Sequence, residues 1–320
     1  MSSVKLIGIV GCGAVVREMY SQILNSQPGY HVGYVCDRSA DQAEAAASMF
    51  GAKVASLEEL AADSDAVIIA APPASHLSLV EATIAPDRTV LCEKPLMTSS
   101  GDARAAVEMA AQAGSRLYVG HFRRTFPNVR LARELANLGL IGRVTSISAC
   151  EGGRFTWRTT SDYPVKDVTG GVLWDTGSHT LDMALHAAGL DTLQVTDIEV
   201  DRVRRDKQEP SHDISADFGF QANGDQVRGH LHVSRKDALP NLIQIDGTTG
   251  SIAFVAGLDD AVRLTTPRGS TVLRAGLEHS EQLECFELQV RRILTGEGAD
   301  DFKADRFIGQ IEILEAVANA

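Results

Sequence analysis

The stretch from Val4 to Arg17 constrains the fold of this chain more than any other. An apolar, β-branched run up to Val10 is followed by Gly11-x-Gly13 and then by a helix-forming segment. This pattern is typical of a buried first strand that turns into a first helix around a pyrophosphate. Gly11 permits the tight turn, and Gly13 has no Cβ, so the backbone there can approach phosphate groups. The dinucleotide site predicted from this pattern includes Gly11, Gly13, Ala14 and Val15.

Short apolar runs alternate with helical segments through the first 121 residues. Later strands are predicted at 30–36, 66–71, 89–92 and 117–120, and helices at 14–24, 40–50, 75–84 and 100–113. The capping-box spacing of Ser56 and Glu59 predicts a further short helix. Strands separated by single helices predict a doubly wound parallel sheet of the Rossmann type. Ligands of such sheets bind beyond the carboxyl ends of the strands. The polar and turn residues that fall there are Asp37, Pro72, His76, Glu93, Lys94 and His121.

Asp37 and Arg38 follow the second predicted strand and bear on the choice of cofactor. A carboxylate at this distance from the glycines accepts a hydrogen bond from a ribose 2′-hydroxyl and repels a 2′-phosphate. Asp37 therefore favours NAD. Arg38 keeps NADP open, because a guanidinium can pair with that phosphate or stack on adenine.

The turn Glu93-Lys94-Pro95 ends the strand at 89–92. A lysine is costly to bury and rarely ends a core strand without a partner. At this edge its ammonium could bind or protonate a substrate oxygen beside a nicotinamide ring. The competing interpretation is a surface turn with a Glu–Lys pair. The Lys94–Pro95 bond could be cis, which the sequence does not decide.

After residue 121 the alternation stops, which predicts a second domain from 122 to 320. Its predicted strands lie at 144–151, 195–203, 214–220, 227–233, 242–245, 251–255 and 262–265, and its helices at 128–137, 278–294 and 304–318. Consecutive hairpin-like strands predict a large, open, mainly antiparallel sheet. The polar loop 152–170 carries Arg154 and Trp157, which suit a sugar-like or phosphorylated ligand.

Asp175 and His179 lie four residues apart in a predicted helix that runs to Gly189. This spacing puts them on one helix face, and Asp182 lies close to that face. An Asp beside a His orients the ring and prepares it for proton transfer near neutral pH. A surface ion pair is one alternative. A metal pair is another, but no further ligands at metal spacing support it, so no metal is expected.

Bulk composition limits the possible partners and location. The net charge of −12 argues against nucleic acid and anionic membranes as partners, and no apolar run is long enough to span a bilayer. The five cysteines are scattered and odd in number, which fits reduced thiols in the cytoplasm. The short apolar run before Cys12 makes a signal peptide improbable.

Taken together, the chain resembles the glucose–fructose oxidoreductase/inositol dehydrogenase (Gfo/Idh/MocA) family along nearly its whole length. The matching motifs are Gly-Cys-Gly at 11–13, Asp37, Pro72-Pro73-x-x-His76, Glu93-Lys94-Pro95, Arg124-x-x-Pro127, Gly170-Gly171-x-Leu173-x-Asp175-x-Gly177-x-His179-x-x-Asp182, and Gly247-Thr248-x-Gly250. Val16 departs from the family pattern, which frequently has Gly or Ala there, and its branched side chain is expected to push the first helix outward.

The resemblance implies an NAD(P) domain followed by a domain whose open sheet often forms the interface of a homodimer or homotetramer. It implies that Lys94, Asp175 and His179 are catalytic. These three are also expected to bind substrate, together with Arg154 and Trp157 of the polar loop. The cofactor contacts expected beyond the glycine turn are Asp37, Arg38, Ala71, Pro72, His76, Glu93, Lys94 and Arg124. The implied activity is hydride transfer between nicotinamide and a secondary alcohol or ketone of a sugar, cyclitol or sugar derivative. The alternatives are a cofactor-bound sensor without turnover and an eliminating relative that recycles its NAD.

Overall fold

The computed structural model describes residues 5–154, 171–209, 211–276, 279 and 281–320. These residues form two compact units, and each unit has its own sheet. The first unit contains residues 5–120 and 287–305, and the second contains the described parts of 121–286 with 306–320. The predicted division into two domains after residue 121 stays a prediction. Residues 287–305 do not follow that division, because they group with the first unit although they come late in the chain.

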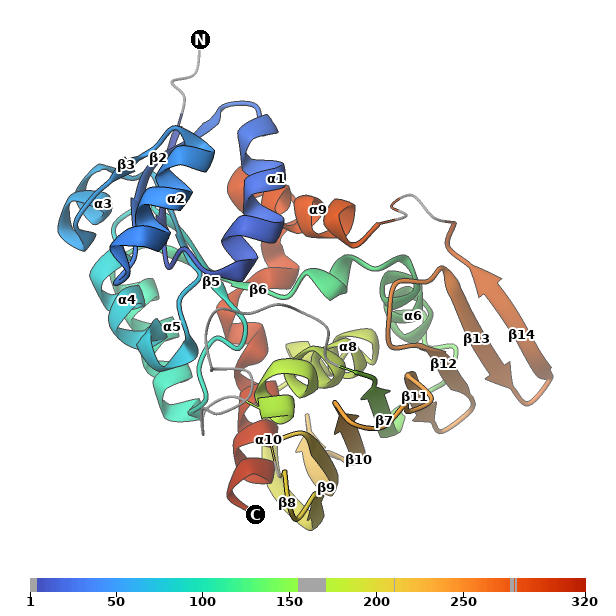
Figure 1. Ribbon diagram of the computed structural model, residues 1–320. Helices are drawn as coiled ribbons and strands as arrows, with labels where there is room; N and C mark the ends of the chain where they lie inside the picture. The colour runs from blue at the N-terminus through green and yellow to red at the C-terminus, as the bar shows by residue number, and fades with distance from the viewer. Residues whose placement is uncertain (1–4, 155–170, 210, 277–278, 280) are drawn as a thin grey trace. The chain divides into compact units, whose positions relative to one another are not determined.

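Six parallel strands form the sheet of the first unit. They are β1 (Lys5–Val10), β2 (Tyr30–Cys36), β3 (Lys53–Val54), β4 (Ala66–Ile69), β5 (Thr89–Glu93) and β6 (Arg116–Gly120), in the order β3-β2-β1-β4-β5-β6. This is the order of doubly wound dinucleotide-binding sheets, in which the winding reverses between β1 and β4. The predicted Rossmann fold is confirmed (Figure 1).

Helices connect these strands where the sequence predicts them. They are η1 (Val16–Tyr20), α1 (Ser21–Ile23), η2 (Leu24–Ser26), α2 (Ala40–Phe50), α3 (Leu57–Asp63), η3 (Pro73–Ser75), α4 (His76–Thr83) and α5 (Ser100–Gln112). A capping box of Ser56 and Glu59 opens α3, and Gly51 ends α2 with a φ of 65°. The first helix differs from expectation because η1 is a π-helical turn that begins at the fully buried Val16. The strand β3 was not predicted, because its two residues are both exposed and give no apolar pattern.

Eight strands form the sheet of the second unit. They are β7 (Val144–Gly152), β8 (Val195–Arg205), β9 (Asp213–Ala222), β10 (Asp225–Ser234), β11 (Leu242–Gly247), β12 (Ser251–Val255), β13 (Ala261–Thr266) and β14 (Gly269–Arg274), in the order β14-β13-β12-β11-β7-β10-β9-β8. The β7–β10 pairing is parallel and the other pairings are antiparallel, which confirms the mainly antiparallel prediction. The edge strand β14 was missed because its exposed residues do not alternate between apolar and polar.

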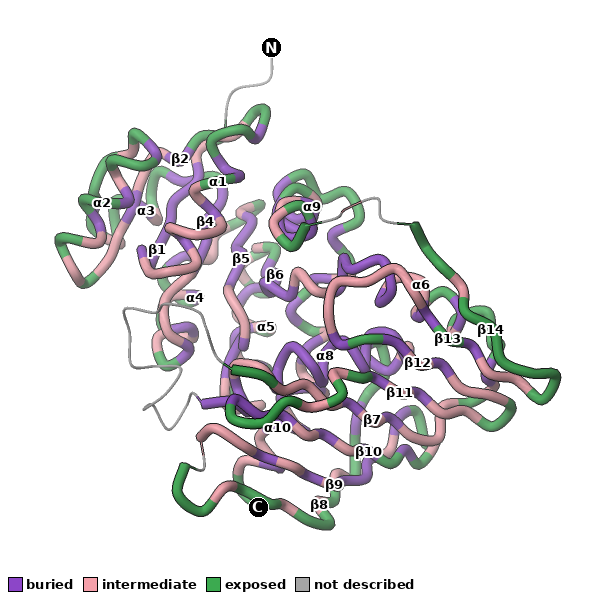
Figure 2. The backbone as a smooth tube through the Cα atoms, turned by 45° about the vertical axis from the view of Figure 1, so that its right-hand side comes forward, coloured by how far each residue is buried: buried purple, intermediate pink, exposed green. Residues whose placement is uncertain are grey.

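Helices cover one face of this sheet. In the described part of the second half, the helical segments are η4 (Phe122–Thr125), α6 (Pro127–Asn137), η5 (Leu173–Gly177), α8 (Ser178–Ala187), η6 (Leu190–Thr192), α9 (Gln282–Thr295), η7 (Ala299–Phe302), η8 (Ala304–Phe307) and α10 (Ile308–Asn319). Helix α8 contacts β7, β10 and β11, while α6 contacts β12 and β13 and α10 contacts β8. Along most of β10, burial alternates from residue to residue, as the colours in Figure 2 indicate. Because successive strand residues point to opposite faces, the face away from the helices carries the less buried residues. Among the described residues, no helix is both long and apolar enough to cross a bilayer.

Candidate functional site

The turn after β1 combines a crowded glycine with an open one. Gly11 has a φ of 88°, and a Cβ there would lie 2.6 Å from the amide nitrogen of Ala71. The Gly11 N–H also donates to the carbonyl of Cys36 at 2.8 Å, which ties the ends of β1 and β2 together. Within the described chain, nothing comes within 4 Å of a Cβ built on Gly13. The space at Gly13 therefore fits the close approach of a phosphate to the backbone, as a bound dinucleotide requires.

Asp37 is held in a fixed orientation at the end of β2. Its Oδ2 accepts a hydrogen bond from the N–H of Cys12 at 2.7 Å, and its Oδ1 accepts one from the N–H of Ser39 at 2.8 Å. Because each carboxylate oxygen can accept more than one hydrogen bond, acceptor capacity remains for a ribose hydroxyl. Arg38 is exposed beside it. The side chains present fit a dinucleotide, and the contact of each one with it stays a prediction.

Glu93 fixes the start of the turn that carries Lys94. Its Oε1 accepts a hydrogen bond from the Tyr20 hydroxyl at 2.7 Å, and its Oε2 accepts one from the Lys94 N–H at 3.3 Å. Burial raises the pKa of Glu93, and the Tyr20 hydrogen bond and the Lys94 charge oppose that rise. A Cβ on Gly120 would lie 2.9 Å from this carboxyl group, so β6 needs a glycine there. Glu93 is thus occupied by protein donors, and a cofactor contact from it stays a prediction.

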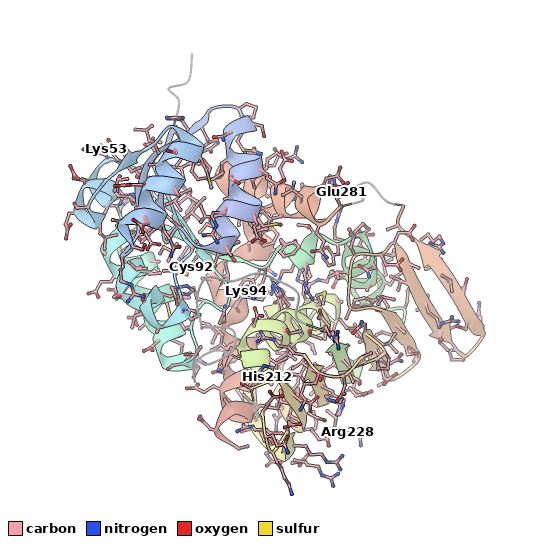
Figure 3. The ribbon with its side chains drawn as sticks, viewed as in Figure 1. Lys53, Cys92, Lys94, His212, Arg228 and Glu281 are labelled. Carbon is pink, nitrogen blue, oxygen red and sulfur yellow. The ribbon has the colours of Figure 1, made fainter. Side chains whose placement is uncertain are left out.

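His76 fixes the other side of the same turn. The Lys94–Pro95 bond is cis, and the buried His76 ring places Nδ1 3.0 Å from the carbonyl of Pro95 and 2.9 Å from that of Leu96. Its Nε2 lies 2.8 Å from the carbonyl of Ala71, just after β4. Burial lowers the pKa of His76. The ring therefore links the end of β4 to the loop after Lys94, and these contacts do not favour the predicted cofactor contact. Figure 3 marks Lys94 where β5 ends.

The predicted proton-transfer pair lies on consecutive helical segments of the second unit. Asp175 is in the π-helical turn η5, and His179 is in the first turn of α8. π-Helical turns recur at functional sites. The Asp175 carboxylate forms an ion pair through Oδ2 with Nη2 of Arg235, and His179 is 8% exposed. The His179 ring meets that of His121 edge-on, with 5.3 Å between their centroids. The catalytic roles of Asp175 and His179 stay predictions.

Asp182 and Arg124 belong to a buried ion network. The Arg124 guanidinium donates from Nε to Oδ2 of Asp182 at 2.9 Å, from Nη2 to Oδ1 of Asp182 at 2.6 Å, and from Nη1 to Asp191 at 3.1 Å. It also lies 3.9 Å over the Phe307 ring. These contacts give the side chain of Arg124 a structural place, so they do not favour the cofactor contact predicted for it.

Asp191 is the second acid of this network. Burial alone would raise its pKa, but the His186 hydrogen bond and the charges of Arg124 and Arg133 hold the pKa well below its usual value. Burial lowers the pKa of His186, with Arg124 acting in the same direction. The network therefore places the Asp191 carboxylate against the His186 ring, with 3.0 Å between Oδ2 and Nδ1, in the interior of the unit.

The structure describes only the first residues of the predicted substrate loop, 152–170. Arg154 is exposed just after β7, and Trp157 lies outside the described residues. Sequence reasoning missed Arg235, and it gave His121 no role beyond its place at a strand end. The available signal was slight, because an arginine that follows a strand is common on protein surfaces. Over the described ranges, no three His, Cys, Asp or Glu side chains form a group that could hold a metal ion.

Sequence profiles of one oxidoreductase family match both halves of the chain. The profile of the Gfo/Idh/MocA oxidoreductase family, NAD-binding Rossmann fold, matches residues 5–121, and that of the Gfo/Idh/MocA C-terminal domain matches residues 129–253.

Two curated relatives illustrate the similarity. An inositol 2-dehydrogenase from Rhizobium meliloti is 28% identical over 59% of this chain and 56% of its own length. This match therefore spans only about half of the relative. A dTDP-3,4-didehydro-2,6-dideoxy-α-D-glucose 3-reductase from Streptomyces violaceoruber is 27% identical over 98% of this chain and 94% of its own.

Solved structures share the fold. An oxidoreductase from Agrobacterium radiobacter, in complex with NAD+, L-tartaric acid and magnesium, has a TM-score of 0.78 at 23% identity and covers 99% of this chain and 97% of its own. A 3-ketoreductase from Actinomadura kijaniata, in complex with NADP and TDP-benzene, has a TM-score of 0.75 at 19% identity and covers 98% of this chain and 97% of its own. The glycine turn, the strand order and the two matched profiles agree, and the chain belongs to the Gfo/Idh/MocA family of NAD-binding oxidoreductases.

Proposed function

We propose that this chain is an NAD(P)-dependent dehydrogenase acting on CH–OH groups, which interconverts a secondary alcohol and a ketone of a sugar, cyclitol or sugar derivative. The observation that carries the proposal is the place of Lys94. It follows β5 at the carboxyl edge of the Rossmann sheet, on a turn held by Glu93 and His76. Relatives named for inositol and for a deoxysugar support the substrate class.

In the proposed oxidation, Lys94 and His179 act on the same substrate oxygen. Bound NAD+ supplies the hydride acceptor, C4 of its nicotinamide ring. The Lys94 ammonium stabilises the negative charge that develops on the oxygen as the C–H bond breaks. His179 takes the hydroxyl proton, and Asp175 orients its ring and stabilises the imidazolium. The proton could instead go to Lys94, and the variants below separate the two.

Asp37 supports a preference for NAD. Its carboxylate is held by two backbone N–H groups where a 2′-phosphate would bind in NADP. Arg38 is the group that would accommodate NADP.

The test is turnover on a broad panel of polyols, sugars and sugar phosphates, followed by NADH absorbance. We expect wild-type activity on at least one of them, and a loss of about 10²- to 10⁴-fold in kcat for His179→Ala and for Lys94→Ala. Fluorescence titration with NADH serves as the control that each variant still binds cofactor. Unchanged turnover in His179→Ala would remove His179 from the mechanism and leave the proton to Lys94. Tight NADH binding without turnover on the whole panel would contradict the dehydrogenase assignment and indicate a cofactor-bound sensor.

We also infer a cytoplasmic homodimer or homotetramer that associates through the open sheet. The five cysteines are free. On the sheet, Leu242 and Val255 are paired across β11 and β12 and both are exposed, at 40% and 42%. Burying such side chains against a second copy is favourable. Light scattering after gel filtration checks the inference, which a monomer at all concentrations would contradict.

A further inference from the structure

We propose that Arg235 is a positioning residue for Asp175: its guanidinium holds the Asp175 carboxylate in place and balances its charge beside His179. The inference rests on the proposed function, because it assigns Arg235 a part in the same reaction. Arg235 lies just after β10 and belongs to none of the sequence motifs.

The ion pair itself is well enclosed. Nη2 of Arg235 donates to Oδ2 of Asp175, and the two side chains are 3% and 24% exposed. A guanidinium stays protonated under all ordinary conditions, and a buried one requires an anionic partner. Asp175 retains enough exposure to act on a ligand while one of its oxygens is held by protein.

The two residues are anchored on one turn. The carbonyl of Ser211 accepts a hydrogen bond from the Val172 N–H, and the carbonyl of His212 accepts one from the Arg235 N–H, both at 2.7 Å. The η5 turn that carries Asp175 and the backbone of Arg235 are therefore attached to consecutive residues. Gly171 reinforces the contact, since it has a φ of 75° and a Cβ there would lie 3.1 Å from Ser211. Figure 3 labels His212 in this turn.

The backbone around Arg235 has further restraints. The Ser234 hydroxyl oxygen accepts hydrogen bonds from the N–H groups of Lys236 and Asp237, at 3.2 and 3.0 Å. The Ser234 carbonyl accepts one from the Gly153 N–H at 3.1 Å. These hydrogen bonds restrain the backbone on both sides of Arg235 and so fix the position of its Cα. A side chain anchored in this way can hold the carboxylate of its partner in one orientation.

The pair also sets the charge around His179. Other titratable or charged side chains of the described residues lie near it. Asp182 is on the same helix, and His121 meets the ring edge-on. Arg124 balances Asp182. Glu151 accepts a hydrogen bond from the neighbouring Thr180 at 2.6 Å. Against this background, removal of the Arg235 charge takes away one positive charge bound to Asp175. The negative charge of Asp175, one helical turn from His179, is then less balanced, and it stabilises the imidazolium form of His179 more strongly.

The experiment is a proton titration of His179 by NMR with isotope-labelled histidine, compared between the full-length wild type and its variants. The His179→Asn spectrum identifies the signal. We expect Arg235→Gln to raise the midpoint of the His179 titration by about 0.5–1 pH unit, and Arg235→Lys to raise that midpoint less. Arg268→Gln, in an exposed turn between β13 and β14, is the matched control and leaves the midpoint unchanged. Adding Asp175→Asn to Arg235→Gln abolishes the shift.

Turnover supplies the second readout. We expect Arg235→Gln to lower kcat by about 10- to 100-fold with a smaller effect on KM, and to move the acid limb of the pH profile with the His179 midpoint. An equal His179 midpoint in wild type and Arg235→Gln overturns the inference. If Arg235→Gln does not fold, Arg235→Lys and Asp175→Asn decide it by the same titration. Absence of wild-type turnover overturns the proposed function. The titration still decides whether Arg235 acts on His179 through Asp175.

Discussion

Gly11 and Gly13 lie two residues apart in one turn, yet an added methyl group meets different surroundings at each. In Gly11→Ala the new Cβ approaches backbone atoms of Ala70 and Ala71 within 3 Å at a positive φ. We expect this variant to lose about 1–3 kcal/mol of unfolding free energy. In Gly13→Ala the methyl group enters open space, so we expect stability to stay within about 0.5 kcal/mol while the affinity for NADH falls. Denaturant unfolding and NADH titration of both variants check this.

Two results would contradict this prediction. Equal loss of stability in the two variants would mean that a methyl group is as crowded at residue 13 as at residue 11. Unchanged NADH affinity in Gly13→Ala would place the pyrophosphate elsewhere.

We expect Asp37 to set the preference between NAD and NADP. In Asp37→Ala the anion that repels a 2′-phosphate is removed, and Arg38 becomes available to pair with it. We expect the ratio of kcat/KM for NAD to that for NADP to fall by about 10-fold or more. Asp41→Ala, an exposed carboxylate in the first turn of α2, is the control that keeps the wild-type ratio. An equal loss with both cofactors would show that Asp37 supports only the fold of the turn.

The thiol of Cys12 is predicted to be inert. Burial, together with the charges of Asp37 and Cys36, raises the pKa of Cys12 to about 12, and the side chain is 1% exposed. Because the thiolate is the reactive form, iodoacetamide at about pH 8 should leave Cys12 unmodified in the native protein and should label Cys150, which is partly exposed. Peptide mass spectrometry measures this. Labelling of Cys12 as fast as Cys150 would mean that the turn opens in solution.

At the scale of elements, the sequence predicts regular segments well because their patterns are local. The strands at 66–69 and 89–92 are buried on both faces and read as continuous apolar runs. The capping box at Ser56 and the glycine after Phe50 mark helix ends through contacts within a few residues.

Other elements depend on information that local patterns do not hold. A π-helical turn takes in an extra residue without changing which side chains are apolar, so η1 and η5 both read as ordinary helix. The Arg235–Asp175 pair joins residues 60 positions apart and depends on where β10 ends against η5. Arg124 carries a family motif, yet its guanidinium is bound by acids of α8 and η6.

The ion network between η4, α8 and η6 is predicted to stabilise the second unit. Asp191→Asn removes the carboxylate that pairs with Nη1 of Arg124 and with Arg133, while Asp182 still binds Arg124, and should lower the unfolding free energy by about 1.5–3 kcal/mol, because buried guanidinium N–H groups lose a charged acceptor. Asp225→Asn removes an exposed ion pair with Arg143 and should change stability little. Chemical denaturation of the three proteins compares them, and similar stability of Asp191→Asn and wild type would contradict the prediction.

The same network predicts a pH dependence. The pKa of Asp191 is lowered below the usual 3.8, so its stabilising effect is complete above about pH 4 and is lost as pH falls further. The pKa of His186 is lowered below 6.5, so its neutral form stabilises the fold above about pH 6.5 and this contribution is lost on acidification. Stability should therefore fall as pH drops from 6.5, with a shallower fall below pH 4 in Asp191→Asn. Melting curves across this range test it, and equal slopes in the two proteins would contradict it.

For the whole molecule, the proposed reaction requires residues from two compact units to act on one substrate. Lys94 belongs to the first unit, and Asp175 and His179 belong to the second. Sequence motifs predict both sets because each set is local. That the two sets act on one substrate is the central proposal.

The most direct measurement is a crystal structure of the full chain with NAD+ and a polyol that it oxidises. We expect Nζ of Lys94 and a ring nitrogen of His179 both to lie about 3 Å from one substrate oxygen, whose carbon faces C4 of the nicotinamide. A complex in which Lys94 and His179 contact different regions, with neither near that oxygen, would contradict it.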